Sequence, residues 1–280
     1  MEPQRTNEDA AGTRFAFGKN WLAFLEHLDD ARILLAEQSL RSMLDVDHLQ
    51  GQTFLDIGSG SGLFSLAARR LGATVHSFDY DTQSVACTEE LKRRYFDGDP
   101  AWVVERGSIL DEAYVASLGT FDVVYSWGVL HHTGRMDEAC ALAADTVAPG
   151  GQFFIAIYND QGFISTYWSA VKRVYNRSTI GRVLMTALHA PYLFGVRWVV
   201  RALTGRLSLE RGMSLWHDMT DWLGGYPFEV ARPEVVSQFF RDRGFELTEL
   251  RRCGRRMGCN EFVMRRVAGA PSASSASASR

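Results

Sequence analysis

The chain has 280 residues, of which 46% are hydrophobic and 22% are charged, and its formal net charge is -3. This length and composition favour one large globular domain, or one domain with a substantial insertion, that folds without a metal or a disulfide. The small negative charge argues against a protein built mainly to coat nucleic acid.

The first predicted element is a helix near the N-terminus. The opening segment, MEPQRTNEDAAGTR, is polar and lacks the apolar core of a signal peptide. Apolar side chains then recur at roughly helical spacing from Trp21 to Leu44, which predicts a helix over that range. We expect residues 1–50 to form a helical lid, in which Phe15, Phe17 and Trp21 pack as core or fold over a bound ligand.

From Thr53 onward, short apolar strands alternate with helices, and we expect residues 51–160 to form the core of the fold. The predicted elements are strand Thr53–Ile57, helix Leu63–Arg70, strand Thr74–Phe78, helix Thr82–Tyr95, strands Trp102–Glu105 and Phe121–Ser126, helix Met136–Val147 and strand Gln152–Tyr158. Apolar strands without polar alternation suit a parallel sheet that is covered on both faces. The alternation therefore predicts a doubly wound, Rossmann-like α/β fold.

The alternation stops after residue 160. Residues 161–226 hold long helical patterns and no convincing strand, so we expect a helical cap inserted after the fifth strand. Its most apolar stretch, Val183–Val200, is interrupted and falls short of the ~20 apolar residues of a membrane-spanning helix. Ligands of such sheets bind beyond the carboxyl ends of the strands, so the cap is expected to lie over the substrate.

The C-terminal part of the core is predicted at residues 227–267. It contains a helix at Pro233–Arg243 and strands at Phe245–Leu250 and Glu261–Arg265. The Ser/Ala-rich tail, 268–280, lacks large apolar residues and is predicted to be disordered.

The cysteines predict no metal site. Cys87, Cys140, Cys253 and Cys259 match neither a zinc site nor a CxxC redox pair. We expect reduced, buried thiols in a cytoplasmic protein.

A glycine-rich turn follows the first strand, in the segment FLDIGSGSG. It contains Asp56, Gly58, Ser59, Gly60 and Gly62. Glycines at a strand-to-helix turn permit positive φ and let the backbone approach a ligand closely, and the following helix start offers N–H groups. Such a loop alone is weak evidence, because several classes of nucleotide-binding protein use one.

Three details argue against a pyrophosphate ligand. The dinucleotide pattern requires glycine or alanine at the position of Leu63, and no Lys-Ser/Thr pair follows the loop. Asp56 would also repel a pyrophosphate, whereas its carboxylate suits a ligand with an ammonium group. An NAD(P)-dependent oxidoreductase remains the alternative enzyme class.

Acidic residues follow the second strand in the segment VHSFDYD. Asp79, at the strand end, can accept hydrogen bonds from both hydroxyls of a ribose, and Tyr80 can pack on a purine. The alternative is that Asp79 and Asp81 only cap the next helix, and Asp81 is the better cap candidate.

The segments FLDIGSGSG, VHSFDYD, RGSILD, FDVVYSWGVLHHTG and VAPGGQFFIAIYN resemble, in order and spacing, the class I S-adenosylmethionine (SAM)-dependent methyltransferases. The flanking segments FAFGKNW and DWLGGYPFE resemble an uncharacterised subgroup of this family met in small-molecule and saccharide pathways. The resemblance implies a seven-stranded sheet with an antiparallel last strand. It also implies SAM as cofactor, S-adenosylhomocysteine as product and in-line displacement at the sulfonium methyl.

The resemblance also implies roles for residues of this chain. Asp56 and the loop from Gly58 to Gly62 would hold the methionine end of SAM, and Asp79 would hold the ribose. Many members carry an acid after the third strand that contacts the adenine amine. Here Ser108 stands at that place, so the adenine contact is assigned to Ser108, Ile109 or a backbone group.

Residues after the fourth strand are candidates for the chemistry. Trp127 is expected beside the cofactor, and His131 or His132 is suited to act as a base near neutral pH. The alternative is that one histidine packs structurally and the other faces solvent. We expect a small-molecule acceptor that is methylated on oxygen, with nitrogen or carbon as alternatives.

The acceptor is expected to meet residues after the fifth strand and in the cap. Tyr158 and Asn159 end that strand, while Asp160 is either a further contact or a helix cap. The cap is rich in basic residues, among which Arg173 and Arg211 are proposed to bind an anionic or amphipathic acceptor. Their alternative role is a solvated surface.

Two further classes remain as alternatives. A non-catalytic chain could keep SAM or its product as a structural ligand. Nucleic acid is not expected as substrate, because SWGVLHHTG stands where amino-group nucleic-acid methyltransferases carry an Asn/Asp-Pro-Pro-aromatic motif.

Overall fold

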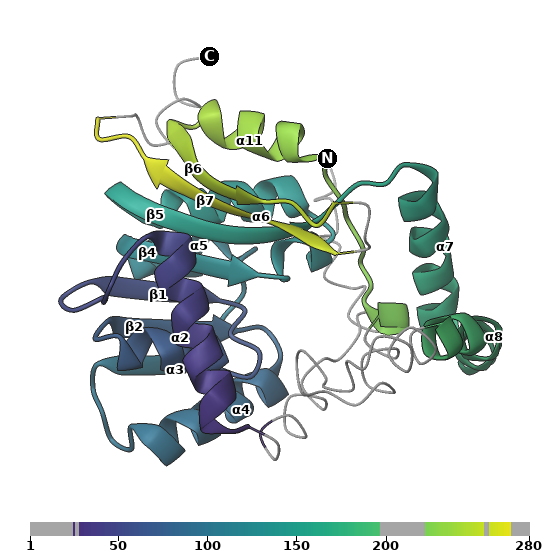
Figure 1. The fold of residues 1–280 in the computed structure, drawn as a ribbon, viewed down its shortest axis with the longest axis horizontal. Helices are drawn as coiled ribbons and strands as arrows, with labels where there is room; N and C mark the ends of the chain where they lie inside the picture. The colour runs from purple at the N-terminus through teal and green to yellow at the C-terminus, as the bar shows by residue number, and fades with distance from the viewer. Residues whose placement is uncertain (1–24, 26–27, 197–221, 255–257, 270–280) are drawn as a thin grey trace, which may run out of the picture. The chain divides into compact units, whose positions relative to one another are not determined.

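A seven-stranded sheet forms the centre of the molecule (Figure 1). The computed structural model describes residues 25, 28–196, 222–254 and 258–269. The strand order is β3-β2-β1-β4-β5-β7-β6, and β7 runs antiparallel to both of its neighbours. The strands are β1 (Thr53–Ile57), β2 (Thr74–Asp79), β3 (Trp102–Arg106), β4 (Phe121–Trp127), β5 (Val147–Tyr158), β6 (Phe245–Arg251) and β7 (Cys259–Arg266). This topology confirms the predicted doubly wound α/β fold with an antiparallel last strand.

Helices bury both faces of the sheet. They are α2 (Asp30–Leu44), α3 (Leu63–Arg70), α4 (Thr82–Tyr95), α5 (Glu112–Leu118), α6 (Met136–Asp145) and α11 (Pro233–Arg241). On one face, Tyr125 of β4 stacks on Phe54 of β1 and on Phe64 of α3. On the other face, Phe153 of β5 packs against Phe240 of α11. The central strands β1, β4 and β5 are mostly buried, so their apolar runs carry little polar alternation, whereas the edge strand β6 is mostly exposed.

The predicted helix from Trp21 to Leu44 is wrong at its start. Helix α2 begins at Asp30, because Asp29 has an extended backbone and its carboxylate accepts the amide hydrogen of Arg32. Asp29 is therefore the N-cap of α2, which does not extend back to Leu28. Residues 21–24 lie outside the described part of the chain.

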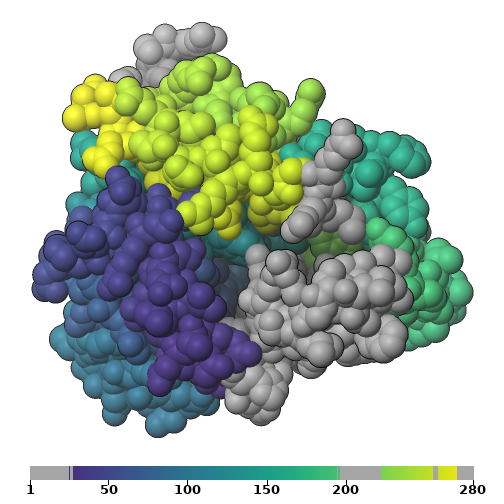
Figure 2. All heavy atoms as spheres, in the orientation of Figure 1, coloured from purple at the N-terminus to yellow at the C-terminus, as the bar shows by residue number. Residues whose placement is uncertain are grey.

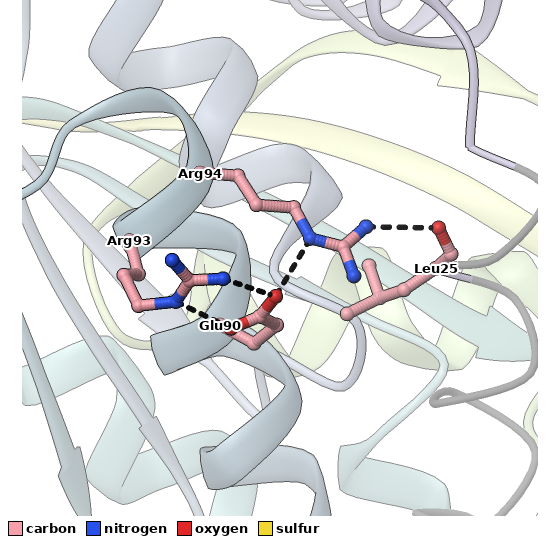
Figure 3. A network of polar contacts seen from close by, with 4 residues as sticks. All are labelled: Leu25, Glu90, Arg93 and Arg94. Carbon is pink, nitrogen blue, oxygen red and sulfur yellow. Dashed lines mark hydrogen bonds and ion pairs between the residues drawn. The ribbon is translucent and has the colours of Figure 1, made fainter.

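A polar network ties the segment before α2 to α4 (Figure 3). Arg94 of α4 donates a hydrogen bond to the carbonyl of Leu25 and another to Glu90, which also binds Arg93. Hydrogen bonds from Arg93 and then Arg94 lower the pKa of Glu90 to about 2. The backbone at Leu25 is thereby held against the helix that follows β2.

Several further boundaries differ from prediction, and the largest difference lies between α6 and β5. Helix α6 ends at Asp145 rather than Val147, and β5 begins at Val147 rather than Gln152. Val147 pairs with Phe121 and Gln152 pairs with Val123, so the intervening residues bulge from the strand. Helix α5 was not predicted, although Asp111 caps it by accepting the amide hydrogen of Tyr114.

The C-terminal strands pack beside the N-terminal helix. Arg251 of β6 donates to the hydroxyl of Ser42 in α2, and Gln152 of β5 donates to the carbonyl of Leu44. Figure 2 shows α2 in purple against the yellow C-terminal hairpin. These two hydrogen bonds attach the C-terminal end of α2 to β6 and β5.

A second compact unit is formed by residues 161–196 and 222–228. It consists of α7 (Phe163–Arg177), α8 (Thr179–Ala190) and the π-helical turn η3 (Pro191–Val196). Its small core contains Trp168, Val171, Tyr175, Leu193 and Leu223. No helix within the described ranges is both long enough and apolar enough to cross a membrane.

Candidate functional site

The glycine-rich loop joins β1 to α3 and lies against the end of β2. Gly58, Gly60 and Gly62 have φ angles of 76°, 56° and 78°, in the left-handed region. The amides of Gly58 and Ser59 donate to the carbonyl of Phe78, at 2.9 and 3.1 Å. The loop is therefore fixed over the carboxyl end of the strand that carries Asp79.

Two of these positions exclude a side chain. A Cβ at Gly58 would lie 2.5 Å from the methyl groups of Val129, and one at Gly62 would lie 2.9 Å from Cγ2 of Thr88. Ser59 and Thr88 share a hydrogen bond of 2.9 Å between their hydroxyls. These glycines thus let the loop lie close to α4 and to the segment after β4. They also permit the left-handed backbone conformation of the loop.

Asp79 binds the same loop through its side chain. One carboxylate oxygen accepts from the amide of Gly60 at 3.0 Å, and the other accepts from the amide of Asp81 at 2.9 Å. Asp81 in turn caps α4 by accepting from the amide of Gln83 at 2.9 Å, which confirms its predicted role as a cap. Asp79 is not this N-cap, and its carboxylate bridges the loop and the residue that caps α4.

Asp56 is turned into the protein beneath the loop. Its side chain is buried, and its carboxylate accepts a hydrogen bond from the hydroxyl of Ser65 in α3 at 2.5 Å. Burial raises the pKa of Asp56 to about 7, the bond from Ser65 lowers it, and the charge of Asp79 raises it. Asp56 and Asp79 thus lie on adjacent strands, close enough for the charge of Asp79 to affect Asp56, but Asp56 binds α3 whereas Asp79 binds the loop.

The predicted adenine residues lie at the ends of β2 and β3. Tyr80 is partly exposed, and the guanidinium of Arg106 lies 5.6 Å from the centre of its ring. The hydroxyl of Ser108 accepts from the amide of Leu110 at 3.2 Å, while Ile109 is buried in the main core. Tyr80 and Ser108 thus lie at the carboxyl-end edge of the sheet, whereas the side chain of Ile109 packs inward.

The two histidines form an aromatic cluster with Tyr158. They lie in a 3-10 turn, η2 (Leu130–His132), directly after β4, and both are buried. The ring of His131 lies 4.2 Å from that of Tyr158 and 4.5 Å from that of His132. The carboxyl ends of β4 and β5 therefore bring together three of the predicted site residues. The alternative in which one histidine packs and the other faces solvent does not hold, because both side chains are buried.

Trp127 and Asn159 bind residues of β7. The indole of Trp127 donates to Glu261 at 2.8 Å, across the intervening strand β5. The side-chain oxygen of Asn159 accepts from Asn260 at 3.0 Å. Both predicted site residues are thus oriented by a strand that the sequence analysis did not assign to the site.

Glu229 is a residue of this region that the sequence analysis missed. Its amide donates to the carbonyl of His131 at 3.0 Å, and its carboxylate accepts from the amide of Met136 at 3.2 Å. Burial raises the pKa of Glu229, while bonds from the amides of Met136 and Gly134 lower it. Since Arg135 provides no side-chain cap to α6, Glu229 caps that helix from a distant part of the sequence.

A hollow of about 540 Å³ lies at the start of α6, beside Glu229, and is separate from the glycine loop. Its lining consists of Arg135, Met136, Asp137, Glu138, Glu229 and Val230. Since charged side chains dominate it and none of the predicted cofactor residues reaches it, we do not assign the site to this hollow.

The remaining predicted residues are placed as follows. Arg173 is exposed on α7 in the second unit, whereas Arg211 lies outside the described residues, as do Phe15, Phe17 and Trp21. Helix α7 has Gly162 as its N-cap, so the prediction of Asp160 as a cap is wrong.

The cysteines are only in part as predicted. Cys87 and Cys140 are buried thiols, whereas Cys253 and Cys259 are partly exposed. Within the described ranges, no group of three or more His, Cys, Asp or Glu residues could hold a metal ion.

Comparison with known proteins identifies relatives of the core. A family model described as a methyltransferase domain matches residues 55–153. The chain is 34% identical over 135 residues to the ribosomal protein L11 methyltransferase of Methylococcus capsulatus, a match that covers 48% of this chain and 41% of that protein. It is 33% identical over 113 residues to a ubiquinone biosynthesis O-methyltransferase of Burkholderia orbicola, with coverages of 40% and 47%. The chain thus spans less than half of the length of these relatives.

Solved structures share the fold at low sequence identity. Magnesium protoporphyrin IX methyltransferase from Synechocystis PCC 6803, with S-adenosylhomocysteine bound, has a TM-score of 0.52 and 12% identity, over 95% of this chain and 90% of that chain. The (4+2)-cyclase SpnF has a TM-score of 0.53 and 12% identity, over 85% and 81%. Since these neighbours are named for different reactions, the fold by itself does not define the chemistry.

Proposed function

We propose that this chain transfers the methyl group of SAM to a hydroxyl of a small molecule. The match of residues 55–153 to a methyltransferase-domain model supports the proposal. The observation that carries the proposal is the loop from Gly58 to Gly62, which Asp79 holds from the end of β2. One loop and one acid at the carboxyl-end edge of a parallel sheet form the place where such folds bind ligands.

The residues at this edge fit a ligand with an amino-acid end, a ribose and a purine. Asp56 offers a carboxylate for an ammonium group, and the loop lacks the side chains that would block a close approach. Asp79 offers acceptors for ribose hydroxyls, and Tyr80 and Ser108 lie beside it for the purine. We assign Ser59 and Trp127 to the same cofactor site.

Methyl transfer from SAM needs little covalent help from the protein, because the bound sulfonium supplies an activated methyl group. The chain therefore mainly has to align the acceptor with that methyl and exclude water. A hydroxyl acceptor also needs a base, for which His131 and His132 are placed at the end of β4. Tyr158 packs against both rings and limits their rotation.

Oxygen is the proposed acceptor atom for two reasons. The histidine pair suits removal of a proton from a hydroxyl near neutral pH. One of the relatives is named as an O-methyltransferase of ubiquinone biosynthesis, and the similarity to it covers the core of this chain. A neutral amine would not require a base before transfer, because it attacks the methyl group through its lone pair.

The helices of the second unit support an amphipathic or anionic acceptor. Large apolar side chains are exposed on one side of α8, at Ile180, Val183, Leu184 and Leu188. From Gln161 to Leu209 the sequence contains no acidic residue. We propose that residues 161–226 form the cap that selects the acceptor, with Arg173 and Arg211 binding its anionic group, and that residues 1–50 form a lid.

Calorimetric titration of the full chain with SAM tests the cofactor assignment. We expect saturable binding in the micromolar range and displacement by S-adenosylhomocysteine. Methyl transfer is then tested with radiolabelled SAM and a panel of phenolic, sugar and amine acceptors. Binding of reduced NAD in place of SAM would contradict the proposal, as would transfer to amines alone.

A further inference from the structure

A series of hydrogen bonds connects four buried side chains, from Trp102 at the start of β3 to Asp56 in β1, just before the glycine loop. The indole of Trp102 donates to the hydroxyl of Ser77 at 2.9 Å, and Ser77 lies 2.7 Å from the hydroxyl of Ser65. Ser65 donates to the carboxylate of Asp56 at 2.5 Å. All four side chains are at most 2% exposed. Solvent therefore does not compete for these hydrogen bonds.

The chemistry of the groups gives this series of hydrogen bonds a direction. An indole N–H can only donate, so the oxygen of Ser77 accepts from Trp102. The single proton of Ser77 then goes to Ser65, and the single proton of Ser65 goes to Asp56. If Asp56 were protonated and donated to Ser65, the proton of Ser77 would have to leave the series for another acceptor. A neutral Asp56 could still accept from Ser65 through its carbonyl oxygen, but a carboxylate gains more from this bond, so the series of hydrogen bonds favours the ionised form.

Other groups around Asp56 act in the opposite sense. Burial and the charge of Asp79 on β2 both raise the pKa of Asp56, to about 7 in total. On β4, the residue in register with Asp56 is Tyr125. In α3, Arg69 binds the carboxylate of Asp99, and Arg70 binds the carboxylate of Glu37 in α2. Asp56 is thus balanced between its two protonation states.

We propose that Trp102, Ser77 and Ser65 are positioning residues that hold Asp56 as a carboxylate beneath the glycine loop and so prepare it for the amino group of the cofactor. The inference rests on the proposed function, because it takes the ammonium of SAM as the cation. In a buried site, an ionised Asp56 attracts that ammonium far more strongly than a neutral one. Cofactor affinity then depends on residues that do not contact the cofactor.

The test is the pH dependence of ligand binding, measured by calorimetry with S-adenosylhomocysteine from pH 5.5 to pH 9. For the wild-type chain, we expect affinity to rise with pH through a midpoint near the pKa of Asp56, which is about 7. Methylthioadenosine, which lacks the amino-acid end, should bind with little dependence on pH. In Ser65→Ala the midpoint should move up by about one pH unit, with about fivefold weaker binding at pH 7 and recovery at pH 9.

Trp102→Phe tests the hydrogen bond of the series that lies farthest from Asp56. It keeps an aromatic ring in the core but removes the N–H, so the midpoint should move in the same direction by a smaller amount. Ser126→Ala is the matched control. Ser126 is also a buried serine, but it donates to the carbonyl of Ile57 and takes no part in the series of hydrogen bonds from Trp102 to Asp56. Its substitution should leave the midpoint unchanged.

Three outcomes would overturn the inference. Wild-type affinity for S-adenosylhomocysteine that does not vary with pH would do so, and so would variants whose midpoints match the wild type. An equal shift of the pH midpoint in Ser126→Ala would mean that the shifts come from general loosening of the core. Absence of any binding by the folded wild-type chain would instead contradict the proposed function itself.

Discussion

The carboxylate of Asp79 accepts a hydrogen bond from the amide of Gly60, with 3.0 Å between oxygen and nitrogen. The acid assigned to the ribose and the loop assigned to the methionine end are therefore one connected structure. A ligand hydroxyl that binds Asp79 has to share the carboxylate with the loop. Ligand binding and loop order are thus expected to be coupled.

Replacement of Asp79 tests this coupling. In Asp79→Ala, we expect SAM affinity to fall by about tenfold to a hundredfold, because hydrogen bonds to a charged acceptor are lost. Calorimetric titration measures the change. Asp81→Asn is the matched control, since asparagine caps a helix about as well as aspartate and affinity should hold. Equal losses in both variants would contradict a specific role for Asp79.

Gly58→Ala should damage the loop more than a change of backbone preference explains. Gly58 and Gly51 have the same φ of 76°, but only the added Cβ at Gly58 would clash, at 2.5 Å from Val129. Chemical denaturation should show a larger loss of stability for Gly58→Ala than for Gly51→Ala, by about 1–3 kcal/mol. Val129→Ala should restore part of the difference. Equal losses at the two glycines would show that the contact with Val129 is unimportant.

The histidine pair is tested by single substitutions at constant cofactor affinity. If one histidine is the base, its replacement by glutamine should lower kcat by about 10²–10⁴-fold while the Kd for SAM stays the same. The other variant should lose less activity, which identifies the base. Full turnover by both His131→Gln and His132→Gln would exclude a base role but would leave methyl transfer intact.

Asp56 should make the ligand-free chain less stable as the pH rises. Its folded-state pKa, about 7, lies above the value of 3.8 for an unperturbed carboxyl. The neutral form is therefore favoured by folding, and its contribution is lost as pH rises from about 4 to 7, at a cost on the order of a few kcal/mol. Melting temperatures at pH 5 and pH 8 should differ less in Asp56→Asn than in the wild type. An unchanged difference would contradict this account.

Glu229 should stabilise the turn that carries the histidines. Glu229→Ala removes the acceptor for the amide of Met136, so we expect a loss of about 1–2 kcal/mol in the free energy of unfolding. Glu229→Gln keeps a side-chain acceptor and should lose less. Denaturant titration of both variants measures the difference, and equal stability of Glu229→Ala and wild type would argue against the cap.

The sequence by itself determined the order of the core elements. Strand Thr53–Ile57 and helices Leu63–Arg70 and Thr82–Tyr95 were predicted with the observed bounds. These elements have continuous apolar runs or local caps, such as Asp81, and both signals depend on neighbours in the sequence. The start of α2 was predicted wrongly, because apolar spacing continues across the cap at Asp29.

Only the tertiary structure decided which groups bind one another. Glu229 caps a helix that begins 93 residues earlier, and Trp127 binds Glu261 across 134 residues. The hydrogen bonds from Trp102 through Ser77 and Ser65 to Asp56 join three strands and a helix. Local sequence patterns report only local backbone preferences, whereas these hydrogen bonds form because parallel strands bring distant residues to one edge of the sheet.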